Sequence, residues 1–198
     1  MYDDMETQEI FSDMRLPERK GFMRRYNKDS VSRRNKISGD YVDPNVETAR
    51  IINDIYGGPD KKVADLGCGT DPLRKLVTNC EEFFSCTFEP EEELELPDYV
   101  VRCDSTRLTM IKDKYFDIAN HTNSHWGKNL MDYVLEDYRI LKDDGILIIT
   151  SVCPLKNNKY YTIANAYLES GLWEYEQGPV KFGGHTAMTR GIFRKKRV

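Results

Sequence analysis

The sequence has 198 residues, enough for one domain of about 150 residues with an appendage but too few for two full domains. Its 29 Lys and Arg residues nearly balance 33 Asp and Glu residues, and 39% of the residues are hydrophobic, which excludes global disorder and favours a globular fold. It has no apolar run of the ~20 residues needed to cross a bilayer, and residues 1–10 are acidic where a secretory signal is basic, so we expect neither membrane insertion nor secretion.

A basic segment lies near the beginning of the chain, after the acidic first ten residues. The stretch from Arg15 to Lys36 holds nine basic and two acidic side chains, and aromatic residues are interleaved with them. This composition favours an anionic partner such as RNA, and binding of that kind weakens steeply with salt. A solvated arm with no partner explains the same composition. We expect residues 1–42 to form a partly disordered basic arm and residues 43–198 to form the domain.

Helices and strands alternate through the domain. Asp43 and Pro44 have the pattern of an N-cap and a first helical residue, and Gly57 ends that helix. Its apolar residues recur at Val46, Ala49, Ile52 and Ile55. We then predict strands at 62–66, 83–88, 99–103, 116–120 and 146–152, and helices at 71–79, 129–141 and 160–170. Strand-like runs at 172–176 and 187–194 flank a loop at 177–186 and predict a closing antiparallel pair. This order predicts an α/β fold with a mostly parallel sheet.

The helix at 129–141 carries a clear apolar stripe. Its members are Leu130, Val134, Tyr138 and Leu141. Gly145 follows, at the point where a left-handed residue is expected to turn the chain into the next strand. The spacing therefore predicts a helix packed on the sheet and joined to it by a short turn.

The most informative segment runs from Val63 to Pro72, where a strand ends in the turn Gly67-Cys68-Gly69 and enters a helix. Glycines let the backbone approach a ligand closely. A dinucleotide site needs a third glycine three residues after the second, and Pro72 stands there instead, which disfavours NAD. Asp71 and Pro72 start the helix, whose free N–H groups favour a smaller anion such as a carboxylate.

Acidic residues follow the next two strands. Glu89 ends the second strand, where a carboxylate can accept both hydroxyls of a ribose, and Asp104 ends the third, where it can accept from the exocyclic amine of an adenine. Ligands of open α/β sheets bind at this edge. Together with the glycine turn, these positions predict a site for a nucleoside that carries an amino acid.

At these residues the sequence resembles the class I S-adenosylmethionine-dependent methyltransferases. Asp65 to Gly69 resembles their first motif, Glu89 and Asp104 their strand-end acids, and residues 141–147 their Leu-Lys-x-Gly-Gly-x-Leu turn. Within them, the order and spacing are most similar to the eukaryotic ribosomal-RNA-processing methyltransferases of the nucleolus, which methylate N1 of an rRNA adenine. The resemblance implies a Rossmann-like, seven-stranded mixed sheet with an antiparallel last strand, helices on both faces, and S-adenosylmethionine as cofactor.

The resemblance also implies where the contacts of the site lie. Cofactor contacts are expected at Asp65, Gly67, Cys68, Gly69, Glu89, Asp104, Ser105, Asn120, His121 and Thr122. The acceptor pocket is expected at Asn123, His125 and Trp126. Trp126 can stack on a base, or it can pack against the following helix, and the two histidines can equally be surface loop residues. An adenine N1 has a free lone pair, so we predict no essential catalytic base and assign no catalytic residue.

The five cysteines include no CxxC pair, so we expect a reducing compartment, no disulfide framework and no metal site. RNA methylation implies a nuclear or nucleolar location, and otherwise a cytoplasmic one. Two further functions remain open. The chain can be a non-catalytic member of the fold that binds RNA or a protein partner during assembly, or a methyltransferase for a small molecule.

Overall fold

The protein was analysed as a computed structural model that describes residues 43–69, 73–87, 98–125, 129–152, 159–182 and 188–197. The expected arm at 1–42, together with Glu89 and Trp126, lies outside these residues. The helical elements are α3 (Pro44–Ile51), a π-helical turn (Ile52–Tyr56), a 3₁₀ turn (Leu73–Lys75), α4 (Leu130–Ile140) and α5 (Lys159–Glu169). The strands are β1 (Lys62–Leu66), β2 (Glu82–Thr87), β3 (Val100–Arg102), β4 (Phe116–Thr122), β5 (Leu141–Val152), β6 (Trp173–Phe182) and β7 (Met188–Lys195).

The strands form one seven-stranded mixed sheet in the order β3-β2-β1-β4-β5-β7-β6. Neighbouring strands among β1 to β5 pair in parallel, whereas β7 is antiparallel to both β5 and β6. The predicted fold class is therefore confirmed, including its antiparallel last strand. The closing pair is longer than expected, because β6 continues through residues 177–182 and pairs with β7 up to Phe182.

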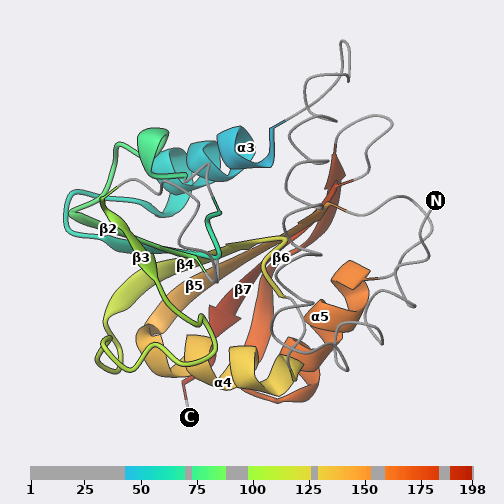
Figure 1. The fold of residues 1–198 in the computed structure, drawn as a ribbon. Coiled ribbons are helices and arrows are strands. Elements are labelled where there is room, and N and C mark those ends of the chain that lie inside the picture. Colours follow the sequence, from blue (N-terminus) through green and yellow to red (C-terminus); the bar gives the residue numbers. More distant parts are fainter. Residues whose placement is uncertain are drawn as a thin grey trace, which may run out of the picture.

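Helices cover both faces of the sheet (Figure 1). On one face α4 and α5 enclose a core that includes Tyr133, Val134, Tyr167 and Trp173. On the other face α3 packs over a second, smaller core around Ile52 and Val63. The central strand β1 is buried from Val63 to Leu66, which agrees with the apolar residues Val63, Ala64 and Leu66; the buried Asp65 is the exception.

The N-terminal helix begins as predicted. The Asp43 carboxylate accepts a hydrogen bond from the backbone N–H of Asn45 at 2.8 Å, and Pro44 follows as the first helical residue. The buried face differs from the predicted one, because Val46 is 51% exposed and Ile55 is 59% exposed. The helix passes into a π-helical turn at Ile52, and this change of winding shifts the residues that face the sheet.

The predicted helix at 71–79 is wrong in its described part, which holds only the 3₁₀ turn Leu73–Lys75. The physical reason is the side chain of Asn53, whose Oδ1 accepts from the backbone N–H groups of Thr78 at 2.9 Å and Asn79 at 3.2 Å. Its Nδ2 donates to the Leu76 carbonyl at 3.0 Å. These side-chain bonds satisfy backbone groups that a longer helix would have paired internally.

The expectation of a left-handed Gly145 is also wrong, since this glycine is absent from the positive-φ residues of the described chain. A Cβ placed at Gly145 would lie 2.8 Å from the Leu141 Cβ and 2.8 Å from the Lys142 carbonyl oxygen. Close approach of the chain to itself therefore requires glycine here. The predicted strand at 146–152 begins earlier, at Leu141, which pairs with Phe116 across an irregularity in the β4–β5 register.

Candidate functional site

The glycine turn lies at the carboxyl end of β1, next to the ends of β2 and β4. Gly67 and Gly69 have φ angles of 81° and 60°, in the left-handed region that favours glycine. The backbone N–H groups of Gly67 and Cys68 donate to the Cys86 carbonyl of β2 at 2.8 and 2.9 Å. These bonds hold the turn against the sheet edge.

The two glycines serve different purposes. A Cβ on Gly67 would collide with the Cβ of Ser124, which belongs to the loop after β4, so a chain contact requires this glycine. A Cβ on Gly69 would have no described atom within 4 Å. Among the described residues, space for a ligand is therefore left on the side of Gly69, whereas Gly67 allows the loop after β4 to lie close to the turn.

Asp65 connects the strands around this turn. It is 3% exposed, and its Oδ2 accepts from the backbone N–H of Leu73 at 3.2 Å, so it spans the turn from one side to the other. Its Oδ1 accepts from Asn120 Nδ2 at 2.8 Å, because Asp65 and Asn120 occupy paired positions of β1 and β4. The carboxylate thus fixes the turn and the end of β4 in one arrangement.

Asn120 offers a polar atom that the protein leaves unused. Its Nδ2 is satisfied by Asp65 and by Thr122 Oγ1 at 3.3 Å, whereas its buried Oδ1 has no hydrogen-bond partner among the described residues. An unsatisfied buried acceptor costs about 1 to 3 kcal/mol, so such groups are normally paired in native structures. A ligand that donates a hydrogen bond beside the turn would satisfy this oxygen.

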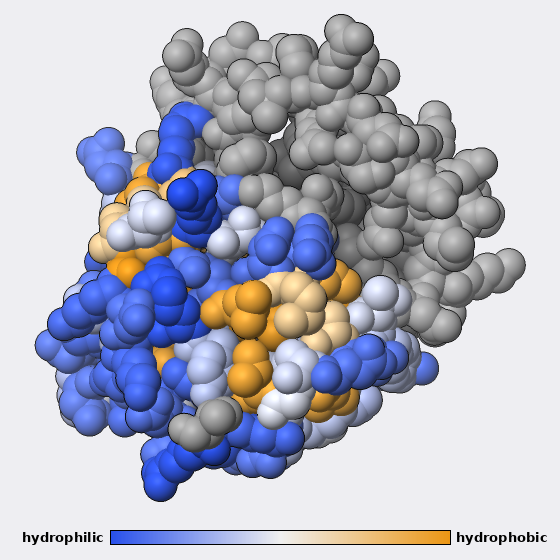
Figure 2. Space-filling model, turned by 90° about the horizontal axis from the view of Figure 1, so that it is seen from below, coloured by the Kyte–Doolittle hydropathy of each residue, from blue (hydrophilic) through white to orange (hydrophobic). Residues whose placement is uncertain are grey.

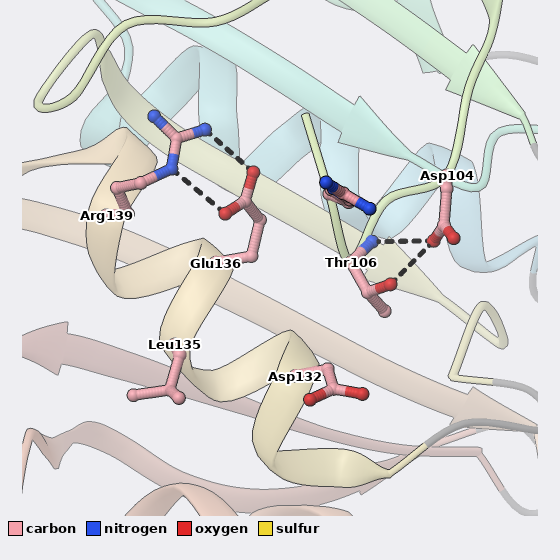
Figure 3. Close-up of a pocket in the computed structure, with 7 residues that line it drawn as sticks. Asp104, Thr106, Asp132, Leu135, Glu136 and Arg139 are labelled. Carbon is pink, nitrogen blue, oxygen red and sulfur yellow. Dashed lines mark hydrogen bonds and ion pairs between the residues drawn. The ribbon is translucent and has the colours of Figure 1, made fainter. Parts of the chain in front are cut away.

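Asp104 lies at the end of β3, in a polar pocket of about 510 Å³ between the following loop and α4 (Figure 3). Its Oδ1 accepts from the backbone N–H of Thr106 at 3.0 Å and from the Thr106 hydroxyl at 2.7 Å. Across the pocket Arg139 donates to both Glu136 carboxylate oxygens, at 2.9 and 2.7 Å. The lining residues come from the loop after β3 and from α4.

The Glu136–Arg139 pair has a structural purpose. Glu136 accepts from the backbone N–H of Leu108, and Arg139 donates to the carbonyls of Leu108 and Ile111. These bonds attach the loop after β3 to α4. The hydrogen bond to the Glu136 carboxylate, with a further one to Asp113, raises the pKa of Arg139 above its usual value. The side of the pocket formed by Glu136 and Arg139 is therefore held in place by hydrogen bonds to the loop after β3.

The two predicted histidines lie in the core. His121 of β4 is 0% exposed and His125 is 5% exposed, which excludes the alternative that both are surface loop residues. His121 contacts Ser124 Oγ through Nδ1 at 2.7 Å and the Asp137 carboxylate through Nε2 at 3.0 Å. His125 Nε2 lies 3.1 Å from the Tyr167 hydroxyl, which donates to Asp137 at 2.6 Å.

The predicted residues thus fall into separate groups. Asp65 and Asn120 meet at the glycine turn, Asp104 lines the polar pocket next to α4 and is followed by the buried Ser105, and the histidines lie in the core. Of the remaining expected contacts, Cys68, Thr122 and Asn123 are half-buried, and Asn123 has a φ of 55°. Glu89 and Trp126 stay predictions outside the described residues.

Sequence reasoning missed Ser124, Asp137 and Tyr167. Ser124 lies beside the predicted pocket, but no motif distinguishes it. Asp137 lies on the buried face of α4 together with Tyr133, Val134 and Ile140. This face overlaps the predicted apolar stripe only at Val134. An aspartate on a helix is ordinarily a solvated residue, so only the fold reveals its burial.

Residues 41–163 match the model of a family described as hypothetical methyltransferase. Ribosomal RNA-processing protein 8 of Caenorhabditis elegans is 33% identical over 110 residues, which cover 55% of this chain and 30% of that protein. The protein of the same name from Dictyostelium discoideum is 29% identical over 92 residues, covering 46% of this chain and 22% of that protein. The chain therefore spans less than a third of the length of either relative.

Solved structures share the fold at low identity. The N-methyltransferase NodS from Bradyrhizobium japonicum, in complex with S-adenosyl-L-homocysteine, superposes with a TM-score of 0.60 at 12% identity, covering 78% of this chain and 89% of NodS. The [4+2]-cyclase SpnF superposes with a TM-score of 0.59 at 15% identity, covering 77% of this chain and 80% of SpnF. Because the family match covers more than half of the chain, this protein belongs to the hypothetical methyltransferase family.

Proposed function

We propose that this chain binds S-adenosylmethionine at the carboxyl ends of β1 and β4 and transfers the methyl group to a base of RNA, by resemblance N1 of an rRNA adenine. The observation that carries the cofactor proposal is the unpartnered, buried Oδ1 of Asn120 beside an open glycine turn, in a chain of a methyltransferase family. NodS, which has the same fold, was solved with S-adenosyl-L-homocysteine, and this supports the same cofactor here.

The residues at the turn fit the amino-acid part of such a cofactor. Asn120 Oδ1 accepts a hydrogen bond from the ammonium group, and the backbone beside Gly69 approaches the ligand from the open side. Asp65 acts as a positioning residue, because it binds Leu73 and Asn120 on either side of the turn. Asp104 accepts from the exocyclic amine of the adenine, and Glu89 accepts from the ribose hydroxyls.

When bound, the cofactor supplies a methyl group on a positively charged sulfur, which is displaced in line by the acceptor. The protein then contributes mainly proximity and alignment, which are worth up to about 7–11 kcal/mol in favourable cases. An adenine N1 attacks with a free lone pair and requires no proton removal first. His121 supports this mechanism, because it is fully buried and both of its ring nitrogens contact other side chains of the protein.

RNA as the acceptor is supported by the curated relatives, which are named ribosomal RNA-processing proteins, and by the basic stretch at residues 15–36. These observations favour a nucleolar location and a protein partner in ribosome assembly as parts of the same proposal. Among the described residues no helix is both long enough and apolar enough to cross a bilayer.

A non-catalytic role is the second candidate. SpnF is described as a cyclase, so a chain with this fold need not be a methyltransferase. In this alternative the protein binds RNA or an assembly partner without transferring a methyl group. A small-molecule acceptor is the third possibility, and the same experiment distinguishes all three.

The test is transfer of a tritiated methyl group from S-adenosylmethionine to total RNA, to protein and to a small-molecule extract, followed by nucleoside analysis of the RNA. We expect label in RNA, as N1-methyladenosine. The matched control is Asp65→Asn, which should reduce incorporation at least tenfold by weakening the cofactor site. Label in the small-molecule extract alone would overturn the RNA proposal, and no transfer by a protein that binds the cofactor would favour the non-catalytic role.

A further inference from the structure

Four polar side chains meet in the core between β4 and the helices that cover it. They are His121 of β4, His125 of the following loop, Asp137 of α4 and Tyr167 of α5, and none is more than 5% exposed. Asp137 Oδ2 lies 3.0 Å from His121 Nε2 and 2.6 Å from the Tyr167 hydroxyl, which is 3.1 Å from His125 Nε2. We call these four residues the His–Asp cluster.

The Asp137 carboxylate needs a positive partner. It is 0% exposed inside an apolar core, and its recorded contacts are His121 and Tyr167. The Tyr167 hydroxyl donates to this carboxylate at 2.6 Å, and a hydroxyl is a neutral donor. A buried carboxylate is costly unless it is paired with a cation or coordinates a metal ion.

The donor atoms of the cluster converge as metal ligands do. One ligand atom each from His121, His125 and Asp137 lies within 4.8 Å of the other two. Ligands at about 2.0–2.1 Å in a tetrahedral zinc site are separated by roughly 3.3 Å. The distance of 3.0 Å between His121 Nε2 and Asp137 Oδ2 is close to this value, and no two of the three ligand atoms are more than 4.8 Å apart, so an ion would draw the most distant pair together. Two imidazoles and a carboxylate form a common zinc donor set.

The atoms behind the cluster support the same assignment. A metal-bound histidine usually donates its other ring N–H to a neighbouring acceptor, which orients the ring. His121 Nδ1 lies 2.7 Å from Ser124 Oγ, so this ring has such a partner in place. The rings are further fixed by Tyr133, whose centroid is 4.7 Å from that of His125 and 5.8 Å from that of His121.

We propose that His121, His125 and Asp137 bind a divalent transition-metal ion, zinc by its preference for this donor set, with the Tyr167 hydroxyl beside the fourth position. When the ion binds, each histidine would keep one proton, on the ring nitrogen that does not hold the ion, and any other proton displaced from the ligand atoms would pass to solvent. His121 then carries its proton on Nδ1 and donates it to Ser124 Oγ, so the imidazole stays neutral.

This ion would stabilise the loop after β4, which lies against the glycine turn. It would join β4, the loop after it, α4 and α5 at one point, and Ser124 of that loop packs directly against Gly67. Its purpose would be structural, because all four residues of the cluster are buried. The proposal does not depend on S-adenosylmethionine or RNA, and its test uses neither.

The test uses the full chain without a histidine tag. The protein is equilibrated with Zn²⁺, passed into metal-free buffer and analysed for zinc per chain, and the visible spectrum is recorded after replacement by Co²⁺. We expect about one zinc per chain, an intense cobalt spectrum of the tetrahedral type, and a melting temperature that a chelator lowers by roughly 5 °C or more. Asp137→Asn and His125→Gln should each weaken zinc binding at least tenfold.

Two variants serve as controls. His185→Gln removes the third histidine of the chain, and Tyr133→Phe removes a hydroxyl beside the rings, and both should retain the full zinc content. A wild-type protein with less than about 0.1 zinc per chain and no response to the chelator would overturn the proposal and leave a purely hydrogen-bonded cluster. Undiminished binding in Asp137→Asn would also overturn it. If that variant fails to fold, a weak, six-coordinate cobalt spectrum in the wild type is the contradicting result.

Discussion

The side chains of Asp65 and Asn120 form a 2.8 Å hydrogen bond between the paired ends of β1 and β4. This bond uses the Asn120 amide hydrogen and leaves Oδ1 as an unpartnered buried acceptor among the described residues. Asp65 therefore fixes the orientation of Asn120 as well as the glycine turn. A defect at Asp65 should accordingly affect stability and cofactor binding together.

Replacing the Asp65 carboxylate with an amide tests this coupling. In Asp65→Asn one oxygen acceptor becomes an NH₂ group that faces a donor, either the Leu73 N–H or the Asn120 amide. We expect a loss of about 1 to 3 kcal/mol in the free energy of unfolding, measured in urea, and at least tenfold weaker binding of S-adenosyl-L-homocysteine. Asp60→Asn, at a side chain that is 78% exposed, is the control and should change stability by less than about 0.5 kcal/mol.

The two glycines of the turn should respond differently to an added methyl group. Gly67→Ala combines an unfavourable φ of 81° with a collision against Ser124, and should cost about 2 to 4 kcal/mol of unfolding free energy. Gly69→Ala meets no atom of the described residues and should cost only the backbone strain of about 1 to 2 kcal/mol. In a Ser124→Gly background the cost of Gly67→Ala should fall by at least about 1 kcal/mol. Equal costs in both backgrounds would contradict the contact.

Asp117 should make part of the stability dependent on pH. Its partial burial tends to raise its pKa, but bonds from Lys142 at 2.7 Å and from the Lys62 backbone at 3.0 Å outweigh this and lower the pKa below its usual value. A lowered native pKa means that the stabilisation is complete above the unfolded value of about 4 and is lost as the pH falls through the native value.

The variant Asp117→Asn measures this contribution. We expect it to lower the free energy of unfolding by about 1 kcal/mol at pH 7, and by progressively less as the pH falls below about 4. Urea unfolding of both proteins from pH 7 to pH 3 provides the comparison, with Asp60→Asn again as the surface control. A difference between wild type and variant that stays constant down to pH 3 would show that Asp117 does not carry this pH dependence.

The parts of the fold that depend on local patterns could be predicted from the sequence. Strand β1 is a short, mostly apolar segment followed by the turn Gly67-Cys68-Gly69. The helix start at Asp43 and Pro44 is set by capping chemistry that involves neighbouring residues only. The helix expected at 71–79 does not form in its described part, because the backbone N–H groups of Thr78 and Asn79 donate to the side chain of Asn53. Asn53 lies more than twenty residues earlier in the sequence. No local pattern reports such a bond.

The candidate site shows the same division. Asp65, Gly67 and Asn120 belong to strand ends that a sequence pattern can locate, and the structure brings them together. The burial of Asp137 depends on His121 from β4 and Tyr167 from α5, so the His–Asp cluster appears only when three elements are packed. The sequence places both histidines near the end of a strand, but it does not predict their hydrogen-bond partners in the core.

The surface of the domain offers a control for the RNA proposal. Figure 2 shows an apolar patch on the side of the molecule where α4 and α5 lie. Met131 and Leu135 of α4 are exposed apolar side chains. RNA binding through phosphates should not depend on this patch. Leu135→Gln, at a side chain that also borders the Asp104 pocket, should therefore leave the salt dependence of RNA binding unchanged.

Charge in the basic arm should control that salt dependence. Replacing Arg24, Arg25, Arg33 and Arg34 with Gln in the full chain should weaken RNA binding and reduce the slope of log K against log salt by about 0.7 for each lost phosphate contact. Binding titrations between 50 and 200 mM salt measure this slope. An unchanged slope would support the alternative of a solvated arm without a partner.

The most direct test of the central claim is a calorimetric titration of the full chain with S-adenosyl-L-homocysteine, repeated with Asn120→Ala. We predict one binding site per chain in the wild type and at least tenfold weaker binding in the variant, because the unpartnered Asn120 oxygen no longer receives the ligand's ammonium group. A folded wild-type protein that gives no binding heat and shows no ligand-induced rise in melting temperature would contradict the account.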